Sequence, residues 1–305
     1  MPRQDLSDGA YDFYCIFWYS PVFSNHMPEL PEVETVARDL RSKILGARIL
    51  GVRTIWPKHW SRSPGGFSRF ARDVNGRTIR AVRRLGKRVV IELSGGKKLL
   101  AHLKMTGNFL WNEAGENNKH IRAVFSLSSG TLYFSDIRKF GRFIYGTDAE
   151  LFRLKDISRL GPDPLELTSK DFIARFSGRR GRIKQALLNQ EIVSGIGNIY
   201  ADEILHAAGI NPEMRVERLN ASRIEAISRH AKRILLASIK ARGTSMRDFR
   251  DTSGDKGNYI GLCKVYGREG KACLRRGCNG SIVRKTVGAR SAHFCLTCQK
   301  INKKI

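Results

Sequence analysis

Four cysteines near the C-terminus form two close pairs. Cys273 and Cys278 are separated by four residues, Cys295 and Cys298 by two, and 16 residues lie between the pairs. Four thiolates from such pairs can surround one zinc ion tetrahedrally, which leaves no open coordination position for a reacting molecule. We therefore predict one structural Zn²⁺ per chain, since four unrelated buried cysteines rarely show this paired spacing. The two other cysteines are not assigned to the site.

The segment between the cysteine pairs is basic. Its sequence, SIVRKTVGARSAHF, is typical of a hairpin and carries Arg284, Lys285 and Arg290. A hairpin of this charge, stiffened by zinc, can press against a phosphate backbone, a contact that positions a protein on nucleic acid. His293 is an alternative ligand, but four cysteines already complete a tetrahedral site.

A second chemical signal is the glycine turn at residues 195–197. Gly195 and Gly197 allow close backbone approach, and the N–H groups at the start of the following helix can hold a phosphate. Asn198 can cap that helix, contact a phosphate, or both. A plain helical hairpin explains the pattern almost as well.

Two apolar side chains stand beside turns. Met105 precedes the turn in HLKMTG, and Phe140 lies in SDIRKFG next to Arg138. In a protein that acts on DNA, an exposed Met or Phe flanked by Arg can enter the base stack and fill the space of an extruded base. Taken singly, both residues would more often belong to a hydrophobic core.

The composition favours a polyanionic partner. The 305 residues carry 55 Lys and Arg against 28 Asp and Glu, a formal net charge of +27. Each phosphate that such a surface neutralises releases condensed counterions. Charge alone does not separate an enzyme from a basic protein with no catalytic role, such as a ribosomal protein. No apolar run reaches the ~18 residues of a membrane span, and the cysteine usage indicates a reducing, cytoplasmic compartment.

The elements that must position these residues change in type along the chain. Residues 1–26 differ in character from the rest of the chain and are treated as an extension outside the fold. A helix is expected after Met27, with Pro31 in its first turn and Gly46 at its end. Residues 47–146 are predicted to form strands, with SGG and SSG as hairpin turns, which indicates a sandwich or barrel.

Helical patterns follow the strands. They lie at about 182–190, 198–208 and 221–241, and Ser222 with Glu225 is a candidate capping box for the last helix. A loop rich in Gly, Asp and Ser then leads to the cysteine module. The predicted order is therefore a helix, a β-sandwich, more helices and a metal finger.

Together, the motifs MPELPEVETV, SDIRKFG and GIGNIYADE and the four-cysteine module resemble bacterial formamidopyrimidine-DNA glycosylase, of the formamidopyrimidine-DNA glycosylase/endonuclease VIII family. Content and order both match, from Met27 to about Lys300. The resemblance implies an α+β multidomain fold. Its parts are an N-terminal β-sandwich with an N-terminal helix at 27–150, a helix-two-turn-helix DNA-binding domain at 151–262, and a zinc finger at 263–300.

The resemblance further implies a base-excision repair enzyme. Such enzymes remove oxidised purines, 8-oxoguanine and formamidopyrimidines, from damaged double-stranded DNA. They then cut the strand at the abasic site by β,δ-elimination. We therefore expect a DNA glycosylase with AP lyase activity that acts as a monomer and is cytoplasmic and nucleoid-associated in a bacterium.

The implied chemistry starts from an N-terminal proline. An amine that attacks C1′ forms a covalent imine, which acidifies the C2′ proton and permits elimination. By resemblance, the amine is that of Pro28, and Glu29 donates a proton to the opening sugar. Lys87 matches the lysine of the first elimination and Arg290 the arginine of the second. Glu203, in YADE, matches an acidic residue near the nucleophile.

The resemblance also implies DNA contacts. The loop at residues 243–258 matches the segment that closes over the flipped base. The positions that match phosphate contacts are His120, Arg138, Arg179 and Asn198. The positions that match side chains filling the vacated space are Met105, Arg138 and Phe140.

Two features depart from the family pattern. The first cysteine pair has four intervening residues where two are commoner, although a four-residue loop can still close on zinc. Residues 1–26 precede the matched start, and while they remain attached the Pro28 nitrogen is an amide without a usable lone pair. We therefore expect activity only from a chain that begins at Pro28, with residues 1–26 mis-assigned or removed and Met27 the true initiator.

Two alternatives remain open. An enzyme of the endonuclease VIII type would favour oxidised pyrimidines, although Leu30 stands where those relatives usually carry glycine. A zinc-finger protein that recognises damage without cutting DNA is the other alternative, and retention of residues 1–26 would favour it.

Overall fold

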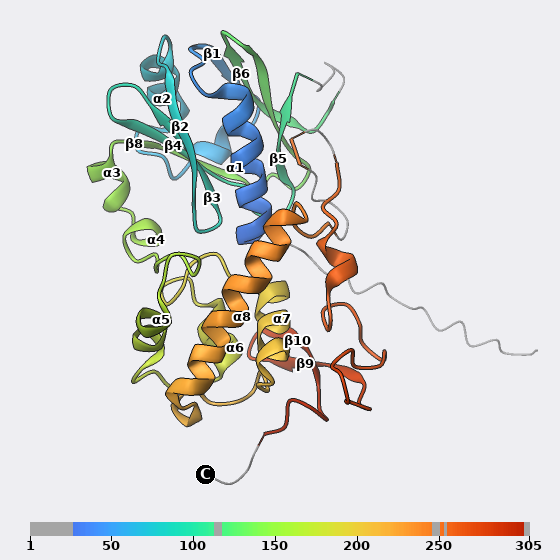
Figure 1. Ribbon diagram of the computed structural model, residues 1–305. Coiled ribbons are helices and arrows are strands. Elements are labelled where there is room, and N and C mark those ends of the chain that lie inside the picture. The colour runs from blue at the N-terminus through green and yellow to red at the C-terminus, as the bar shows by residue number, and fades with distance from the viewer. Residues whose placement is uncertain (1–26, 113–117, 246–250, 253–254, 302–305) are drawn as a thin grey trace, which may run out of the picture.

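The computed structural model describes residues 27–112, 118–245, 251–252 and 255–301. The extension at residues 1–26 and part of the loop at 243–258 therefore lie outside the described residues. Within the described part, a β-sandwich precedes a helical half and a C-terminal two-stranded hairpin (Figure 1). The predicted α+β fold, with its N-terminal sandwich and helical domain, is confirmed.

The sandwich consists of two four-stranded antiparallel sheets, ordered β1-β6-β7-β5 and β2-β3-β4-β8. Aromatic rings fill the space between them, with Trp60 stacked on Phe70 and Phe143 at centroid distances of 4.4 and 4.7 Å. Alternating apolar residues supply the inner faces. The strands are β1 (Ile49–Thr54), β2 (Ile79–Leu85), β3 (Arg88–Leu93), β4 (Lys97–His102), β5 (Gly107–Trp111), β6 (Ile121–Leu127), β7 (Gly130–Asp136) and β8 (Arg142–Gly146).

The region predicted as strands also contains helix, so that prediction is wrong in part. Helix α2 (Gly66–Val74) and the 3₁₀ helix η1 (Pro57–Trp60) interrupt it. Phe70 and Val74, four residues apart, are both fully buried against the sandwich. A nine-residue helix has too few turns for its 3.6-residue period to be recognised between strands.

Helix α1 (Leu30–Ile44) joins the two halves of the molecule. Leu30 belongs to the helical core, whereas Val33, Val36 and Leu40 belong to the sandwich core. Pro31 lies in the first turn as predicted, and a capping box between Glu29 and Glu32 starts the helix. In Figure 1 the lower end of α1 meets the upper end of α8 (Ala221–Lys240).

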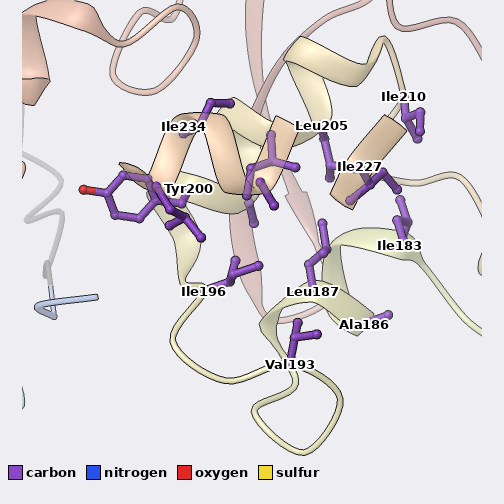
Figure 2. Close-up of a cluster of buried hydrophobic side chains, with 14 of the residues drawn as sticks. Ile183, Ala186, Leu187, Val193, Ile196, Tyr200, Leu205, Ile210, Ile227 and Ile234 are labelled. Atoms are coloured by element: carbon purple, nitrogen blue, oxygen red, sulfur yellow. The ribbon is translucent and has the colours of Figure 1, made fainter. Parts of the chain in front are cut away.

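The helical half packs α5, α6, α7 and α8 around one apolar core (Figure 2). Ile227 and Ile234 of α8 face Tyr200 and Leu205 of α7 there. The capping box predicted at Ser222 is wrong, because Asn220 caps α8 by accepting a hydrogen bond from Arg223 N. The remaining helices are α3 (Asp148–Phe152), α4 (Lys155–Ser158), α5 (Ser169–Phe176), α6 (Ile183–Leu188), α7 (Asn198–Ala208), η2 (Val216–Arg218) and η3 (Tyr259–Leu262).

The C-terminal module is a two-stranded antiparallel hairpin, here called the finger hairpin. It comprises β9 (Ile282–Val287) and β10 (Arg290–Cys295). The hairpin lies beside α7 and α6 (Figure 1). Among the described residues, no helix is long and apolar enough to cross a membrane.

Candidate functional site

A cleft of about 1140 Å³ lies where the sandwich, the helical half and the finger hairpin meet. Separate chain segments converge on it, and Pro28 is buried between two of its lining residues. The predicted site residues that line it are Glu29, Lys87, Met105, Asn198 and Arg290, together with Met27. The cleft therefore combines a carboxyl group, an amine and a guanidinium contributed by distant parts of the sequence.

The Glu29 side chain closes the start of α7. Its Oε1 accepts a hydrogen bond from Ile199 N at 3.0 Å, and Tyr200 N lies 3.5 Å from Oε2. Burial, reinforced by the nearby Glu32, raises the pKa of Glu29 from 4.5 to about 7 against the opposing effect of Lys87. Near neutral pH this group can therefore both hold and release a proton.

This arrangement corrects two expectations about the glycine turn. The N–H groups of Ile199 and Tyr200 meet Glu29 and are not open to a phosphate, and Gly197, not Asn198, is the N-cap residue. The expected close approach is to α1: a Cβ on Gly197 would lie 2.2 Å from Glu29, and one on Gly195 2.8 Å from Leu30. The glycines thus dock α1 onto the helical half.

Lys87 lies in the two-residue turn between β2 and β3, not in the strand itself. The preceding Gly86 has φ +56°, and a Cβ there would meet Leu160 and Ser194 of the helical half. Burial lowers the pKa of the Lys87 ammonium, opposed by the glutamates and reinforced by Arg290. The amine is thereby brought closer to its neutral form, which accepts a proton.

Glu32 is a buried carboxyl group that the sequence reading assigned no role at the site. Its Oε2 accepts from Glu29 N at 2.9 Å, and its Oε1 accepts from Thr244 N at 2.7 Å and from Tyr200 Oη at 2.5 Å. Burial raises its pKa, and these donors oppose the rise. Glu32 thus fixes the segment beside Pro28 to α7 and to the start of the loop after α8.

A second buried network holds the hairpin that carries Arg290. Lys184 Nζ donates to Asp202 Oδ1 at 2.6 Å and to Ser291 O at 2.5 Å. Asp202 Oδ2 accepts from His293 N at 2.8 Å. His293, considered as a zinc ligand, instead places its ring Nδ1 3.2 Å from this carboxylate. The sequence did not indicate the Lys184–Asp202 ion pair, because the two residues lie on separate helices.

Glu203 is a buried carboxylate that binds the segment leading into the finger. Its carboxylate accepts from the backbone N–H groups of Lys264, Val265 and Tyr266 at 2.8 to 2.9 Å. It is not among the cleft-lining residues. Its contacts tie α7 to the segment that enters the finger, and its expected place near the nucleophile stays a prediction.

His102 lines the cleft and was not among the predicted residues. Its Nδ1 accepts from Lys104 N at 3.1 Å. Burial, with the nearby cations of Lys104, Arg88 and Lys87, lowers its pKa well below the usual 6.5. The ring is therefore neutral, and its proton lies on Nε2, which can donate a hydrogen bond.

The remaining predicted DNA-contact residues lie outside the cleft lining. Phe140 is 44% exposed and the Arg138 guanidinium lies 4.9 Å from the centre of its ring, so Phe140 is not a core residue. His120 is half-buried just before β6, and Arg179 is exposed after α5. The structure thus places Met105 and Asn198 at the cleft and the other predicted contacts outside its lining, with the Arg138 turn bonded to the turn of Met105.

The four paired cysteines converge as their spacing predicts. Their Sγ atoms all lie within 4.8 Å of one another. The Sγ atoms of Cys273 and Cys298 are 3.8 Å apart, and those of Cys278 and Cys295 are 3.7 Å apart. Since a tetrahedron with ~2.3 Å metal–sulfur bonds has edges of ~3.8 Å, the cluster fits one metal ion.

Comparison with known proteins gives consistent results along the chain. Residues 27–143 match the N-terminal domain model of formamidopyrimidine-DNA glycosylase, and residues 160–250 match the H2TH domain model of the same enzyme. The formamidopyrimidine-DNA glycosylase of Pelotomaculum thermopropionicum is 45% identical over 281 residues, which span 90% of this chain and all of the relative.

Solved structures agree with this result. A complex of a Lactococcus lactis FPG mutant with DNA containing Fapy-dG has a TM-score of 0.82 at 31% identity, covering 90% of this chain and all of that one. A complex of wild-type Lactococcus lactis FPG with DNA containing an oxidised pyrimidine has a TM-score of 0.81 at 31% identity and the same coverage. The chain therefore belongs to the formamidopyrimidine-DNA glycosylase family of DNA repair enzymes.

Proposed function

We propose that this protein is a bifunctional DNA glycosylase and AP lyase that removes 8-oxoguanine and formamidopyrimidines from double-stranded DNA, with the Pro28 amine as nucleophile. The observation that carries the proposal is the convergence of Glu29, Lys87 and Arg290 on one cleft beside Pro28. In the proposed reaction these side chains supply an acid, a base and a cation to a single sugar. Family membership alone would not specify this chemistry.

The proposed reaction uses each group once. The lone pair of the Pro28 nitrogen attacks C1′, the glycosidic bond breaks, and the base leaves with the bonding electrons and takes up the proton that the Pro28 nitrogen loses. Glu29 protonates the sugar ring oxygen as the ring opens, which gives an iminium at C1′. Lys87 accepts the C2′ proton so that the 3′ phosphate leaves, and Arg290 acts in the second elimination, which releases the 5′ phosphate.

The pKa shifts support these roles. A carboxyl group with a pKa of about 7 retains its proton in a large fraction of molecules at neutral pH. A lysine with a lowered pKa spends more time as the neutral amine that accepts a proton. Such perturbed groups facing one cleft are typical of catalytic sites.

We further propose that the cysteine cluster holds one structural Zn²⁺, bound by Cys273, Cys278, Cys295 and Cys298. When bound, the ion stiffens the finger and supplies no reaction step, because four thiolates complete its coordination. The basic hairpin beside it, with His120, Arg179 and Asn198, is proposed to hold DNA phosphates. Met105, Arg138 and Phe140 are proposed to fill the space of the flipped base.

The active form is proposed to begin at Pro28. The matched N-terminal domain starts at Met27, which supports this start. In a longer chain the Pro28 nitrogen belongs to a peptide bond, and its lone pair is delocalised into the carbonyl group. Residues 1–27 would then block the chemistry of the Pro28 nitrogen.

Borohydride trapping tests the proposal. Two chains are compared on duplex DNA with 8-oxoguanine: one that begins at Pro28, as verified by intact mass, and one that keeps residues 1–27. We expect a covalent adduct from the first chain only. Absence of an adduct from the verified Pro28 chain would defeat the mechanism, and equal trapping of both chains would defeat the role of the Pro28 amine.

A matched lesion series tests the substrate class. Duplexes that differ only in the lesion, 8-oxoguanine or an oxidised pyrimidine, are cleaved under single-turnover conditions. We expect faster excision of the purine. The pyrimidine must be included because a solved relative binds DNA that contains one. Preference for the pyrimidine would favour the endonuclease VIII type of specificity.

A further inference from the structure

The turns that carry Met105 and Phe140 share one buried carboxylate. Asp136, at the end of β7, is fully buried, and its Oδ1 accepts a hydrogen bond from Thr106 Oγ1 at 2.5 Å. Its Oδ2 accepts from Gly141 N at 2.7 Å. Thr106 directly follows Met105, and Gly141 directly follows Phe140. One side chain thus bonds to both turns, at the residue next to the half-buried Met105 and at the residue next to the exposed Phe140.

Further contacts reinforce this link. Thr106 Oγ1 also accepts from Arg138 N at 2.9 Å, so one hydroxyl bonds to the carboxylate and to the second turn. His59 Nε2 lies 3.2 Å from Asp136 Oδ2. Burial alone would raise the pKa of Asp136, yet the nearby His59 ring and the bonds from Thr106 and Gly141 N lower it below its usual range. The carboxylate is therefore charged and well bonded at neutral pH.

The second turn is shaped for this contact. A Cβ on Gly141 would lie 2.8 Å from the Phe134 ring and 3.0 Å from Asp136 Oδ2, so a larger residue would push its N–H away from the carboxylate. The Arg138 guanidinium stacks over the Phe140 ring at 4.9 Å. The turn therefore has a fixed, buried base and an exposed aromatic tip.

We propose that Asp136 is a positioning residue that acts through Thr106 to hold the Met105 turn and the Phe140 turn at a fixed separation, so that their side chains enter the duplex as one wedge. This inference rests on the proposed function and deepens it, since it concerns how the same site opens DNA. Turns that moved separately would fill the vacated space poorly. Extrusion of the base, not bond breaking, is then the step that depends on Asp136.

The test uses the chain that begins at Pro28. Thr106→Val keeps the side-chain shape but removes the hydroxyl, and Thr106→Ser is the matched conservative variant. Excision of 8-oxoguanine from a duplex is compared with cleavage of an abasic site in a single strand, which needs no wedge. We expect Thr106→Val to slow duplex excision ~10- to 100-fold and to change single-strand cleavage by less than about twofold. Thr106→Ser should stay close to the parent.

Met105→Ala supplies an independent measurement. If Thr106 acts through the wedge, adding Thr106→Val to Met105→Ala costs little beyond the loss caused by Met105→Ala alone. Full additivity, equal losses on both DNA substrates, or a Thr106→Ser variant as slow as Thr106→Val would overturn the inference. A parent chain that excises no 8-oxoguanine refutes the proposed function, whereas an active parent with an unaffected Thr106→Val variant refutes only the role of Asp136.

Discussion

Gly197→Ala is expected to displace the Glu29 carboxyl group while leaving the fold almost intact. A Cβ at this position would lie 2.2 Å from Glu29 Cδ, 2.5 Å from Oε1 and 2.6 Å from Cγ, whereas ordinary contacts begin at 3.4 Å. The carboxyl group must therefore retreat by about 1 Å, a distance over which catalytic geometry is lost. The backbone at Gly197 has φ −129°, which alanine adopts without strain.

The effects on stability and on rate should differ in size. Only the flexible end of Glu29 has to move, so the free energy of unfolding should fall by about 1 kcal/mol, much of it from replacing glycine at an N-cap. The move breaks the 3.0 Å hydrogen bond from Ile199 N and misplaces the proposed proton donor. Misplacement by ~1 Å can slow a reaction ~100-fold.

The assay is single-turnover excision of 8-oxoguanine by the chain that begins at Pro28, with thermal unfolding measured in parallel. Gly261→Ala is the matched control, because a Cβ there meets nothing within 4 Å. Gly195→Ala, unlike Gly197→Ala, should mainly lower the stability of the fold. The φ of Gly195 is +90°, and a Cβ there would lie 2.8 Å from Leu30. A Gly197→Ala rate within about threefold of the parent would refute the placement of Glu29 at the reacting sugar.

Three further predictions concern stability and metal. In the chain that keeps residues 1–27, Glu29→Gln removes a carboxyl group whose pKa burial raises from 4.5 to about 7. The folded parent holds this proton more tightly than the unfolded chain, so its free energy of unfolding falls as the pH rises from about 4.5 through about 7. In urea unfolding, the variant should therefore gain up to about 3 kcal/mol relative to the parent by pH 8. A difference between the two that does not change with pH would contradict this. Lys184→Met removes the buried ammonium beside Asp202, which keeps only its contacts with His293, and should cost ~3–5 kcal/mol. Adding Asp202→Asn should recover part of this loss, and additive losses in thermal unfolding would exclude coupling between the two residues. Cys278→Ser should lower both the zinc content by elemental analysis and the affinity for DNA by fluorescence anisotropy, and full zinc occupancy would exclude this cysteine as a ligand.

Local patterns in the sequence predicted much of the fold. The isoleucines of α8 repeat with the helical period, and the predicted range 221–241 agrees with Ala221–Lys240. The paired cysteine spacing predicted the convergence of four Sγ atoms. Each of these two patterns lies within a single short segment, so the local geometry of the chain is enough to relate its residues. Helix α2 escaped prediction because nine residues carry too little periodicity.

The interior of the site could not be predicted in the same way. Glu29 closes a helix that begins about 170 residues later, and no local rule connects the two. The Asp136 carboxylate and the Lys184–Asp202 pair likewise depend on which elements pack together. Burying a polar group without hydrogen-bond partners is unfavourable. The burial of these groups could therefore be predicted only with their partners known.

The docking of the first residues of α1 against the turn before α7 has a consequence for synthesis. Glu29 and Ile199 are 170 positions apart, so at ~5–20 residues per second the partner leaves the ribosome about 10 to 30 s after the N-terminal segment. During that interval the residues next to Pro28 lack their partners in the turn before α7. An aminopeptidase that trims the nascent chain at Met27 would therefore act before folding buries the nucleophile, and a chain that escapes trimming would fold with its amide already enclosed.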